Sequence, residues 1–215
     1  MIDFYYRSIP NGWKVSIMPE ETGLSHTLKP VNVGVGDQFK LEFLPISPNA
    51  RMPVMIVDHD TLDGPLPVFE SGAILVYLAD KAGGFMKKDP AGRYETLQWL
   101  MFQMSAVGPM FGQVGFFHKF AGKEYEDKRP RDRYVAEARR LLGVLDRRLA
   151  DRPWLTGEDY TIADIATFPW VNNLIGFYGA AELVTFSEFT HVAGALKAFL
   201  ARPAVVRGLD IPKRG

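Results

Sequence analysis

Cysteine is absent from the 215 residues of this chain. This absence excludes structural disulfides, zinc–thiolate sites, Cys-x-x-Cys redox chemistry and a cysteine nucleophile. If thiol chemistry takes place here, the ligand must bring the sulfur. The histidines lie far apart, and no two of them are separated by three or four residues as a helical metal site requires: His26, His59, His118 and His191. We therefore expect no metal ion.

The chain also lacks an excess of charge and a long apolar run. It has 25 Lys plus Arg against 25 Asp plus Glu, so no net field favours nucleic acid or an anionic membrane. No apolar run approaches the roughly 18 residues that span a bilayer, and residues 1–4 lack the basic segment of a signal peptide. We expect a cytoplasmic protein. Its 47% hydrophobic residues suffice for the core of one large domain or two small ones.

The first third of the chain follows a β-α-β pattern. Residues 3–6 predict a short strand, Asn11-Gly12 begins a helix that runs to about residue 22, and residues 26–33 predict a second strand. Pro19 falls inside the helix and should cost about 3 kcal/mol unless the helix kinks or starts again there. Residues 38–44 predict a loop or a short helix. A hairpin follows over residues 54–58 and 66–69, and a helix begins at Ser71 and ends at Gly83-Gly84.

From Pro90 onward only helical patterns remain. Helices are predicted over residues 93–108, 131–150, 161–178 and 191–201, with a kink or break at Gly108-Pro109. Thr161-Ile162-Ala163-Asp164 has the layout of a capping box, which we interpret as purely structural. The pattern therefore predicts a first domain over residues 1–83, a linker over 84–89 and an all-helical domain over 90–215.

Two short segments together predict a site for an extended peptide with a carboxylate at one end. Pro53 cannot donate to a sheet ladder, and if the Met52–Pro53 bond is cis the Met52 backbone turns outward and can bind a peptide by strand addition. Glu70-Ser71-Gly72 stands where a strand runs into a helix, so the Ser71 hydroxyl and unpaired helix N–H groups face one point. This arrangement favours an anion.

The order of elements, the proline before the third strand and the Glu-Ser pair at the following helix resemble the cytosolic glutathione transferase family. The similarity to its nu-class branch, the glutathione-dependent disulfide-bond oxidoreductases, rests on six segments: 10–12, 36–39, 46–49, 69–75, 98–100 and 108–113. The resemblance implies an α/β thioredoxin-like N-terminal domain, an all-α C-terminal domain and a homodimer. It also implies that glutathione binds in the cleft between the domains.

The resemblance further assigns roles to individual residues. It implies that Glu70 and Ser71 bind the γ-glutamyl end of glutathione, and that the Met52 backbone, beside Pro53, binds the cysteinyl part. Gln38 and Arg133 would hold the glycyl end or a second glutathione. Arg133 lies in the basic run 128–133, which could equally be a solvated helix start.

The sulfur site departs from the pattern of the branch. Its members usually carry a threonine two residues before the asparagine, where this chain has Ile9. Asn11 keeps its amide donor at the mouth of the first helix, where the amide and the helix dipole would lower the thiol pKa of the ligand. Asn11 could also be the N-cap of that helix, and one asparagine can serve both roles. Ser8, one residue away, could supply the missing hydroxyl after a backbone shift. Tyr5 or Tyr6 could in principle do so, although core packing is the commoner role of such aromatics.

These observations predict a glutathione-dependent disulfide-bond oxidoreductase or glutathione transferase that uses the thiolate of bound glutathione as its nucleophile. The alternative is a non-catalytic glutathione-binding or interaction protein of the same fold, which Ile9 would allow. A group of apolar residues around Gly108-Pro109 is either core or the pocket for the second substrate: Met104, Val107, Met110, Phe111, Phe116 and Phe117.

Overall fold

The computed structural model describes residues 2–57 and 64–211, and the chain divides into two compact units. The first unit runs to Gly84 and also contains the segment from Pro203 onward, whereas the second runs from Phe85 to Arg202. The sequence pattern places the C-terminal segment in the helical domain, over 90–215. In the structure this segment packs in the first unit instead, because its helix lies against a helix of that unit.

A four-stranded mixed sheet forms the centre of the first unit. Its order is β2-β1-β3-β4, with β1 parallel to β2 and antiparallel to β3, and β3 antiparallel to β4. The strands are β1 (Ile2–Tyr6), β2 (Thr27–Pro30), β3 (Val54–Val57) and β4 (Leu66–Phe69). The predicted β-α-β unit and hairpin are present, and Asp58, His59 and Asp63 lie outside the described residues.

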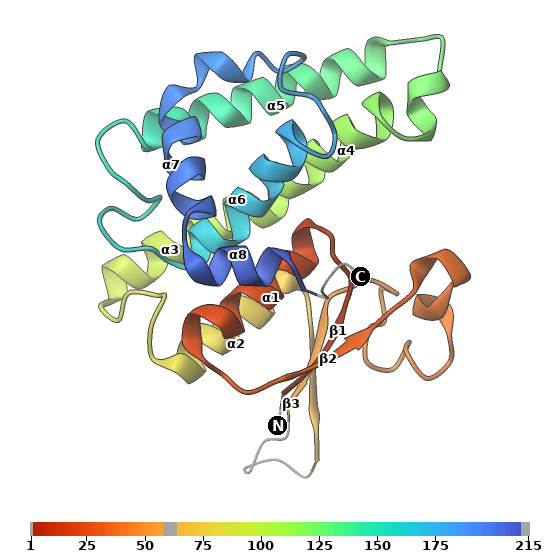
Figure 1. The fold of residues 1–215 in the computed structure, drawn as a ribbon, viewed down its shortest axis with the longest axis vertical. Coiled ribbons are helices and arrows are strands. Elements are labelled where there is room, and N and C mark those ends of the chain that lie inside the picture. The colour runs from red at the N-terminus through yellow and green to blue at the C-terminus, as the bar shows by residue number, and fades with distance from the viewer. Residues whose placement is uncertain (1, 58–63, 212–215) are drawn as a thin grey trace. The chain divides into compact units, whose positions relative to one another are not determined.

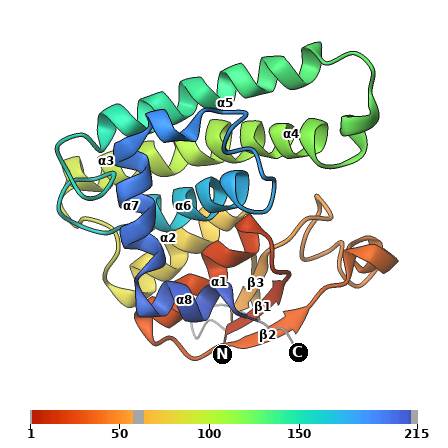
Figure 2. The ribbon, with the colours of Figure 1, turned by 45° about the horizontal axis from the view of Figure 1, so that its top comes forward.

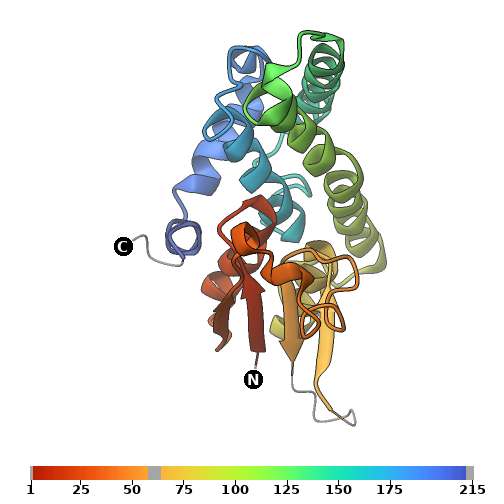
Figure 3. The same ribbon diagram turned by 90° about the vertical axis from the view of Figure 1, so that its right-hand side faces the viewer.

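The second strand is shorter than the predicted 26–33. The ladder with β1 ends at the Tyr6–Pro30 pair, and two residues later the chain turns, where the Asn32 side chain accepts the Gly34 N–H. The segment between β2 and β3 then forms two short 3₁₀ turns, η1 (Val33–Val35) and η2 (Asp37–Phe39), in place of a regular helix (Figure 3). A hydrophobic cluster anchors this segment to the sheet: Val31, Phe43, Met52 and Val54.

Helix α1 (Pro10–Thr22) follows β1 and is buried along most of its length. Its N-cap is Ile9 and Pro10 occupies the first turn, so the helix begins one residue before the predicted Asn11-Gly12. The helix ends at Gly23, as predicted, and it runs through Pro19 without restarting. Burial of every residue from Gly12 to Pro19 supplies packing energy that outweighs the missing backbone hydrogen bond.

Helices α2 (Ser71–Ala82) and α8 (Pro203–Leu209) pack against α1 (Figure 1). The approach of α8 is close, because a Cβ added to Gly208 would lie 2.7 Å from the Ile17 Cα. Ser16 Oγ donates to the Gly208 carbonyl at 2.7 Å, and Arg207 pairs with Glu20 at 2.6 Å. The sequence pattern did not indicate α8, a helix of seven residues.

The second unit is helical. Its α-helices are α3 (Pro90–Phe102), α4 (Gly108–His118), α5 (Arg129–Arg148), α6 (Ile162–Ile175) and α7 (Thr190–Leu200), with 3₁₀ turns η4 (Ala121–Glu124) and η5 (Phe186–Glu188). Helices α4 and α5 run side by side (Figure 2). Thr161 caps α6 and forms the predicted capping box with Asp164. No helix among the described residues is both long enough and apolar enough to cross a bilayer.

The helix predicted over 93–108 is irregular. It begins earlier, at Pro90, and between α3 and α4 the backbone takes π-helical form over η3 (Gln103–Val107). Pro109 lacks an N–H, and its ring crowds the carbonyl four residues before it, so a wider turn at this point relieves the clash. The predicted break at Gly108-Pro109 is therefore a π-helical turn just before it, and the helix continues.

Candidate functional site

The strand register brings the predicted site residues of the first unit to one edge of the sheet. β1 ends beside the start of β3, since Tyr5 pairs with Val54, and β3 starts beside the end of β4, since Val54 pairs with Phe69. β2 also ends at this edge, where Tyr6 pairs with Pro30. Segments that leave or enter the strands here carry all the predicted residues of this unit, which are Ser8, Asn11, Gln38, Met52, Pro53, Glu70 and Ser71.

Met52 and Pro53 stand immediately before β3. The peptide bond between them is cis, as the strand-addition hypothesis requires. The ladder with β4 begins only at Val54, so the Met52 backbone lies outside it, while both residues are buried. The Met52 side chain is 9% exposed and packs in the hydrophobic cluster with Val31, Phe43 and Val54. The side chain thus anchors the residue, while its backbone lies outside the ladder between β3 and β4.

The start of α2 lies opposite Met52, directly after β4. Glu70 is the N-cap residue; its carbonyl accepts the Ile74 N–H at 3.0 Å, but its carboxylate makes no capping hydrogen bond. The Glu70 side chain is exposed and its φ is 70°, a conformation that costs a non-glycine residue on the order of 1–3 kcal/mol. Such strain is typical of ligand-binding positions. Ser71, by contrast, is 2% exposed, at the first position of the helix.

Lys14, which the sequence pattern did not indicate as a site residue, contacts Ser71. This lysine of α1 is fully buried, and its Nζ donates to Ser71 Oγ at 3.2 Å. Burial lowers the Lys14 pKa to about 7, and the nearby Glu70 carboxylate opposes that shift. A sequence signal existed: Lys14 is a single charge between Trp13 and Val15 in an apolar stretch. A charged residue is rarely buried in this way unless it has a specific partner.

Asn11 lies at the second position of α1 and is half-buried. The N-cap interpretation of Asn11 is wrong, because Ile9 holds that position and provides no side-chain cap. Gly12, the next residue, packs so closely against the segment before the helix that a Cβ on it would lie 1.9 Å from the Arg7 carbonyl oxygen. This close packing holds the backbone of the first turn, and with it Asn11, in place. The first turn of α1 also contains no acidic residue, so no carboxylate there opposes an anion near the amide of Asn11.

The hydroxyls near Asn11 are directed elsewhere. Ser8 Oγ donates to the Ile211 carbonyl at 2.9 Å, and the Tyr6 hydroxyl donates to the same oxygen at 2.8 Å. Burial raises the pKa of Tyr6, which disfavours a tyrosinate. Tyr5 packs edge-on against Phe43. A group that stabilises a thiolate must donate its hydrogen to the sulfur, so Ser8 would first have to release Ile211.

Gln38 lies in η2 and is half-buried. Its Oε1 is shielded from solvent and has no hydrogen-bond partner among the described residues. An unpaired buried amide oxygen is costly, and a ligand with a donor group would satisfy it. Arg133 belongs to the other unit; it lies on α5 and its side chain is exposed. Its predicted role stays a prediction.

The apolar group around Gly108-Pro109 divides into core and surface residues. Val107 and Phe111 are fully buried, whereas Phe116 is 37% exposed. Phe117 stacks on Tyr134 with ring centroids 5.6 Å apart. Two members of the group are therefore core, as the plainer interpretation holds, and Phe116 and Phe117 take part in an aromatic cluster with Tyr125.

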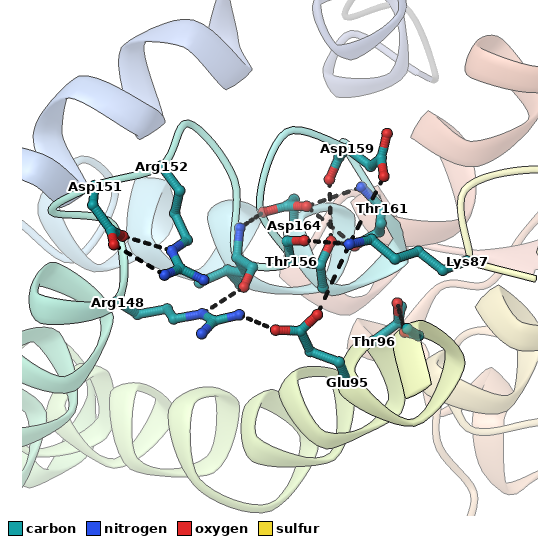
Figure 4. A network of polar contacts seen from close by, with 12 residues as sticks. Lys87, Glu95, Thr96, Arg148, Asp151, Arg152, Thr156, Asp159, Thr161 and Asp164 are labelled. Atoms are coloured by element: carbon teal, nitrogen blue, oxygen red, sulfur yellow. Dashed lines mark hydrogen bonds and ion pairs between the residues drawn. The ribbon is translucent and has the colours of Figure 1, made fainter. Parts of the chain in front are cut away.

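A cleft of about 570 Å³ lies within the second unit, lined by residues 85–89 and 159–161. Of its two lysines, Lys87 is engaged: its Nζ donates to the Thr156 carbonyl at 2.7 Å and lies 3.9 Å from the Glu95 carboxylate and 3.8 Å from the Asp159 carboxylate (Figure 4). Arg148 continues the network through Glu95. These charges satisfy one another, so we interpret the network as structural. Among the described residues, no cluster of three or more His, Asp or Glu side chains is arranged to hold a metal ion.

Comparison with known proteins supplies the family. The model of the glutathione S-transferase N-terminal domain matches residues 1–80, and the model of the C-terminal domain matches residues 130–202. The disulfide-bond oxidoreductase YfcG of Escherichia coli is 48% identical over 174 residues, which are 80% of this chain and 80% of that protein.

Two solved structures are similar over nearly the whole chain. A glutathione transferase family member from Pseudomonas fluorescens Pf-5, with two glutathione bound, is 60% identical with a TM-score of 0.96, over 98% of this chain and 93% of that one. A glutathione transferase from Pseudomonas putida, with one glutathione disulfide bound per subunit, is 57% identical with a TM-score of 0.95. The match covers 98% of this chain and 91% of that one. This chain belongs to the glutathione S-transferase family, in the branch of the disulfide-bond oxidoreductases, and the predicted fold class is confirmed.

Proposed function

We propose that this protein binds glutathione at the sheet edge formed by the ends of β1 and β4 and the start of β3, and uses the thiolate of glutathione to reduce disulfides. The observation that carries the proposal is the convergence there of an amide donor at a helix start, a buried cis-proline turn and an anion-favouring helix N-terminus. The name of YfcG and the glutathione ligands of the two Pseudomonas structures support it.

Each part of the edge suits one part of the peptide. The γ-glutamyl group carries a carboxylate and an amine: the N-terminus of α2 and Ser71 favour the carboxylate, and the exposed Glu70 favours the amine. The Met52 backbone, outside the ladder of β3, is placed to pair with the cysteinyl residue as an added strand would. Gln38, with its unpaired oxygen, is the candidate for the glycyl end or a second glutathione, as is Arg133.

Asn11 is the best candidate for stabilising the sulfur. A thiolate near the start of α1 gains from the helix dipole, and the Asn11 amide can donate a hydrogen bond to it. Ser8 is the weaker candidate, because its hydrogen is donated to the Ile211 carbonyl. The reaction needs no protein thiol, which agrees with the absence of cysteine.

The electrons come from two glutathione molecules. The first thiolate attacks one sulfur of the disulfide, forms a mixed disulfide and releases one thiolate of the substrate. A second glutathione attacks the glutathione sulfur of the mixed disulfide, yields glutathione disulfide and releases the other substrate thiol. Two thiols are oxidised and one disulfide is reduced, so the electrons balance without a further reductant.

We further propose that the protein acts in the cytoplasm as a homodimer, on a small disulfide or, less often, on an electrophilic carbon. The rival proposal is a binding protein of the same fold that has lost the chemistry, which Ile9 in place of the usual threonine would allow. The two are separated by measuring turnover and binding on one preparation.

The experiment compares turnover of a small hydroxyalkyl disulfide with glutathione against glutathione binding measured by calorimetry. We expect both, and we expect activity to survive treatment with iodoacetamide that is removed before the assay, because there is no protein thiol to alkylate. Binding without turnover would favour the binding protein. Absence of binding would overturn the site itself.

A further inference from the structure

The turn that leads from β1 into α1 lacks the side-chain cap that usually fixes a helix start. The N-cap residue Ile9 makes no side-chain capping bond, and Pro10 after it has no N–H to donate. The Ile9 N–H donates to the Arg7 carbonyl at 2.8 Å, a bond that closes a turn of only three residues. Contacts from outside the turn are therefore needed to hold it.

Tyr6, the last residue of β1, makes contacts on both sides of this turn. Its side chain is buried, and its ring lies against the first turn of α1, since a Cβ added to Gly12 would lie 2.8 Å from the Tyr6 Cε2. The Tyr6 hydroxyl donates to the Ile211 carbonyl at 2.8 Å, and Ser8 Oγ donates to the same oxygen at 2.9 Å. One side chain thus joins the start of α1 to the segment that follows α8.

The Ile211 carbonyl receives one hydroxyl from each side of Arg7. A carbonyl oxygen has two lone pairs, so it can accept from Tyr6 and from Ser8 at once. Burial raises the pKa of Tyr6, against the opposing effect of hydrogen bonds with the Ser16 and Ser8 side chains. The Tyr6 hydroxyl therefore keeps its hydrogen at neutral pH and remains a donor to this oxygen.

We infer that Tyr6 is a positioning residue of the sulfur site: its ring supports the first turn of α1, and its hydroxyl, together with that of Ser8, ties this turn to Ile211. The inference rests on the proposed function, because it concerns the helix start that would stabilise the glutathione thiolate. Such stabilisation depends on distance, and a displacement of about 1 Å can remove much of it. In this role Tyr6 does not touch the sulfur.

The alternative is a purely structural role for the Tyr6 hydroxyl. Carbonyl groups near a helix end need donors, and Tyr6 would then serve only to satisfy Ile211 after α8. A structural role predicts that loss of the hydroxyl lowers stability and leaves the glutathione sulfur unchanged. A positioning role predicts a change at the sulfur itself. The thiol pKa of bound glutathione therefore separates the two roles.

The test compares the wild type with Tyr6→Phe, which keeps the buried ring and removes only the hydroxyl. The thiol pKa of bound glutathione is titrated through the ultraviolet absorbance of the thiolate, and kcat and KM are measured for reduction of a small hydroxyalkyl disulfide. We expect Tyr6→Phe to raise this pKa toward the ordinary thiol value of about 8.5 and to lower kcat about 3- to 10-fold, with KM for glutathione nearly unchanged.

Thr22→Val is the matched control, because it removes a hydroxyl bond at the other end of α1, where Thr22 Oγ1 donates to the Met18 carbonyl at 2.9 Å. We expect this variant to match the wild type in thiol pKa and kcat. Equal changes in Thr22→Val and Tyr6→Phe would overturn the inference, because any weakening of α1 would then have the same effect.

The remaining outcomes are distinct. If Tyr6→Phe loses stability to denaturant but keeps the wild-type thiol pKa and kcat, the inference alone is overturned, in favour of the structural role. If the wild type binds no glutathione, the proposed function fails and the inference fails with it.

A double-mutant cycle tests the route through the helix start. If Tyr6 acts by placing the first turn of α1, the loss of kcat in Tyr6→Phe should largely disappear when Asn11 is already alanine. Additive losses would overturn that route. If Tyr6→Phe does not fold, Ser8→Ala replaces it in the cycle, because Ser8 donates to the same Ile211 oxygen. Coupling of Ser8→Ala to Asn11→Ala supports the inference, and additive losses overturn it.

Discussion

Asp164 Oδ1 accepts the backbone N–H of Leu155, nine positions earlier in the chain, at 2.9 Å. The other carboxylate oxygen, Oδ2, accepts the Thr161 N–H at 2.9 Å and the Thr161 hydroxyl at 3.2 Å. One buried carboxylate thus caps the start of α6 and fastens the loop before it. The predicted capping box accounts for the first of these roles, and only the folded loop supplies the second.

Asp164→Ala should lower the free energy of unfolding by about 3 kcal/mol, because two buried backbone N–H groups lose a charged acceptor. Denaturant unfolding measures the change, with Glu158→Ala as the matched control; Glu158 is exposed in the same loop, and its removal should change stability by at most about 0.5 kcal/mol. Similar small losses in both variants would show that the loop does not depend on Asp164.

The pH dependence of stability should carry the signature of Asp164. Burial raises its pKa from 3.8 to about 6, against the opposing effect of its hydrogen bonds. The folded state therefore binds more protons than the unfolded state between these values, and the Asp164 contribution to stability becomes more favourable as pH falls from about 6 to 4. As pH falls from about 6 to 4, the free energy of unfolding of the wild type should therefore increase relative to that of Asp164→Asn, measured by denaturant unfolding at each pH. Parallel curves would contradict the raised pKa.

Gly208→Ala should destabilise the protein by about 1–3 kcal/mol. The new Cβ would meet the backbone of Ile17 at 2.7 Å, and backbone cannot rotate away as a side chain can. Gly194→Ala on α7 is the matched control, since nothing lies within 4 Å of its added Cβ and alanine favours a helix by about 0.5–1 kcal/mol. Thermal unfolding of both variants checks the prediction; a neutral Gly208→Ala would mean that α8 shifts freely on α1.

Asn11→Ala should lower turnover about 10- to 100-fold while it weakens glutathione binding much less, because its proposed hydrogen bond is to the thiolate. Ser8→Ala should lower turnover less, because the Ser8 hydroxyl donates to Ile211. Steady-state kinetics together with calorimetric binding separate these effects. Losses of turnover and affinity of the same size in Asn11→Ala would instead indicate a role in holding the helix start.

Features set by neighbouring residues could be predicted from the sequence. The Thr161–Asp164 capping box, the glycine that ends α1 and the strand-to-helix turn at Glu70-Ser71 each depend on a few adjacent residues, and their types alone indicate the conformation. The helix through Pro19 could not be predicted in the same way. Its continuity depends on burial by partners distant in sequence, which a local propensity does not contain.

The candidate site shows the same division. Met52, Glu70 and Ser71 were predictable because their motifs are local, and the register of three strands then brings them to one edge. The contact between Lys14 and Ser71 could not be predicted in this way, because 57 positions separate the two residues in the sequence. The hydrogen bond between Ser8 and Ile211 spans 203 residues and could not be predicted from the sequence either.

The return of α8 to the first unit has a consequence for the order of synthesis. Ser16 bonds to Gly208 across 192 residues, so this contact forms only after the ribosome has made the whole helical unit. The second unit is continuous in the chain, over residues 85–202, and can fold as it emerges from the ribosome. The first unit is synthesised earlier but stays incomplete until α8 has been made. The surface of α1 that receives α8 therefore lacks this helix throughout that interval, and the first unit is completed by the last described helix of the chain.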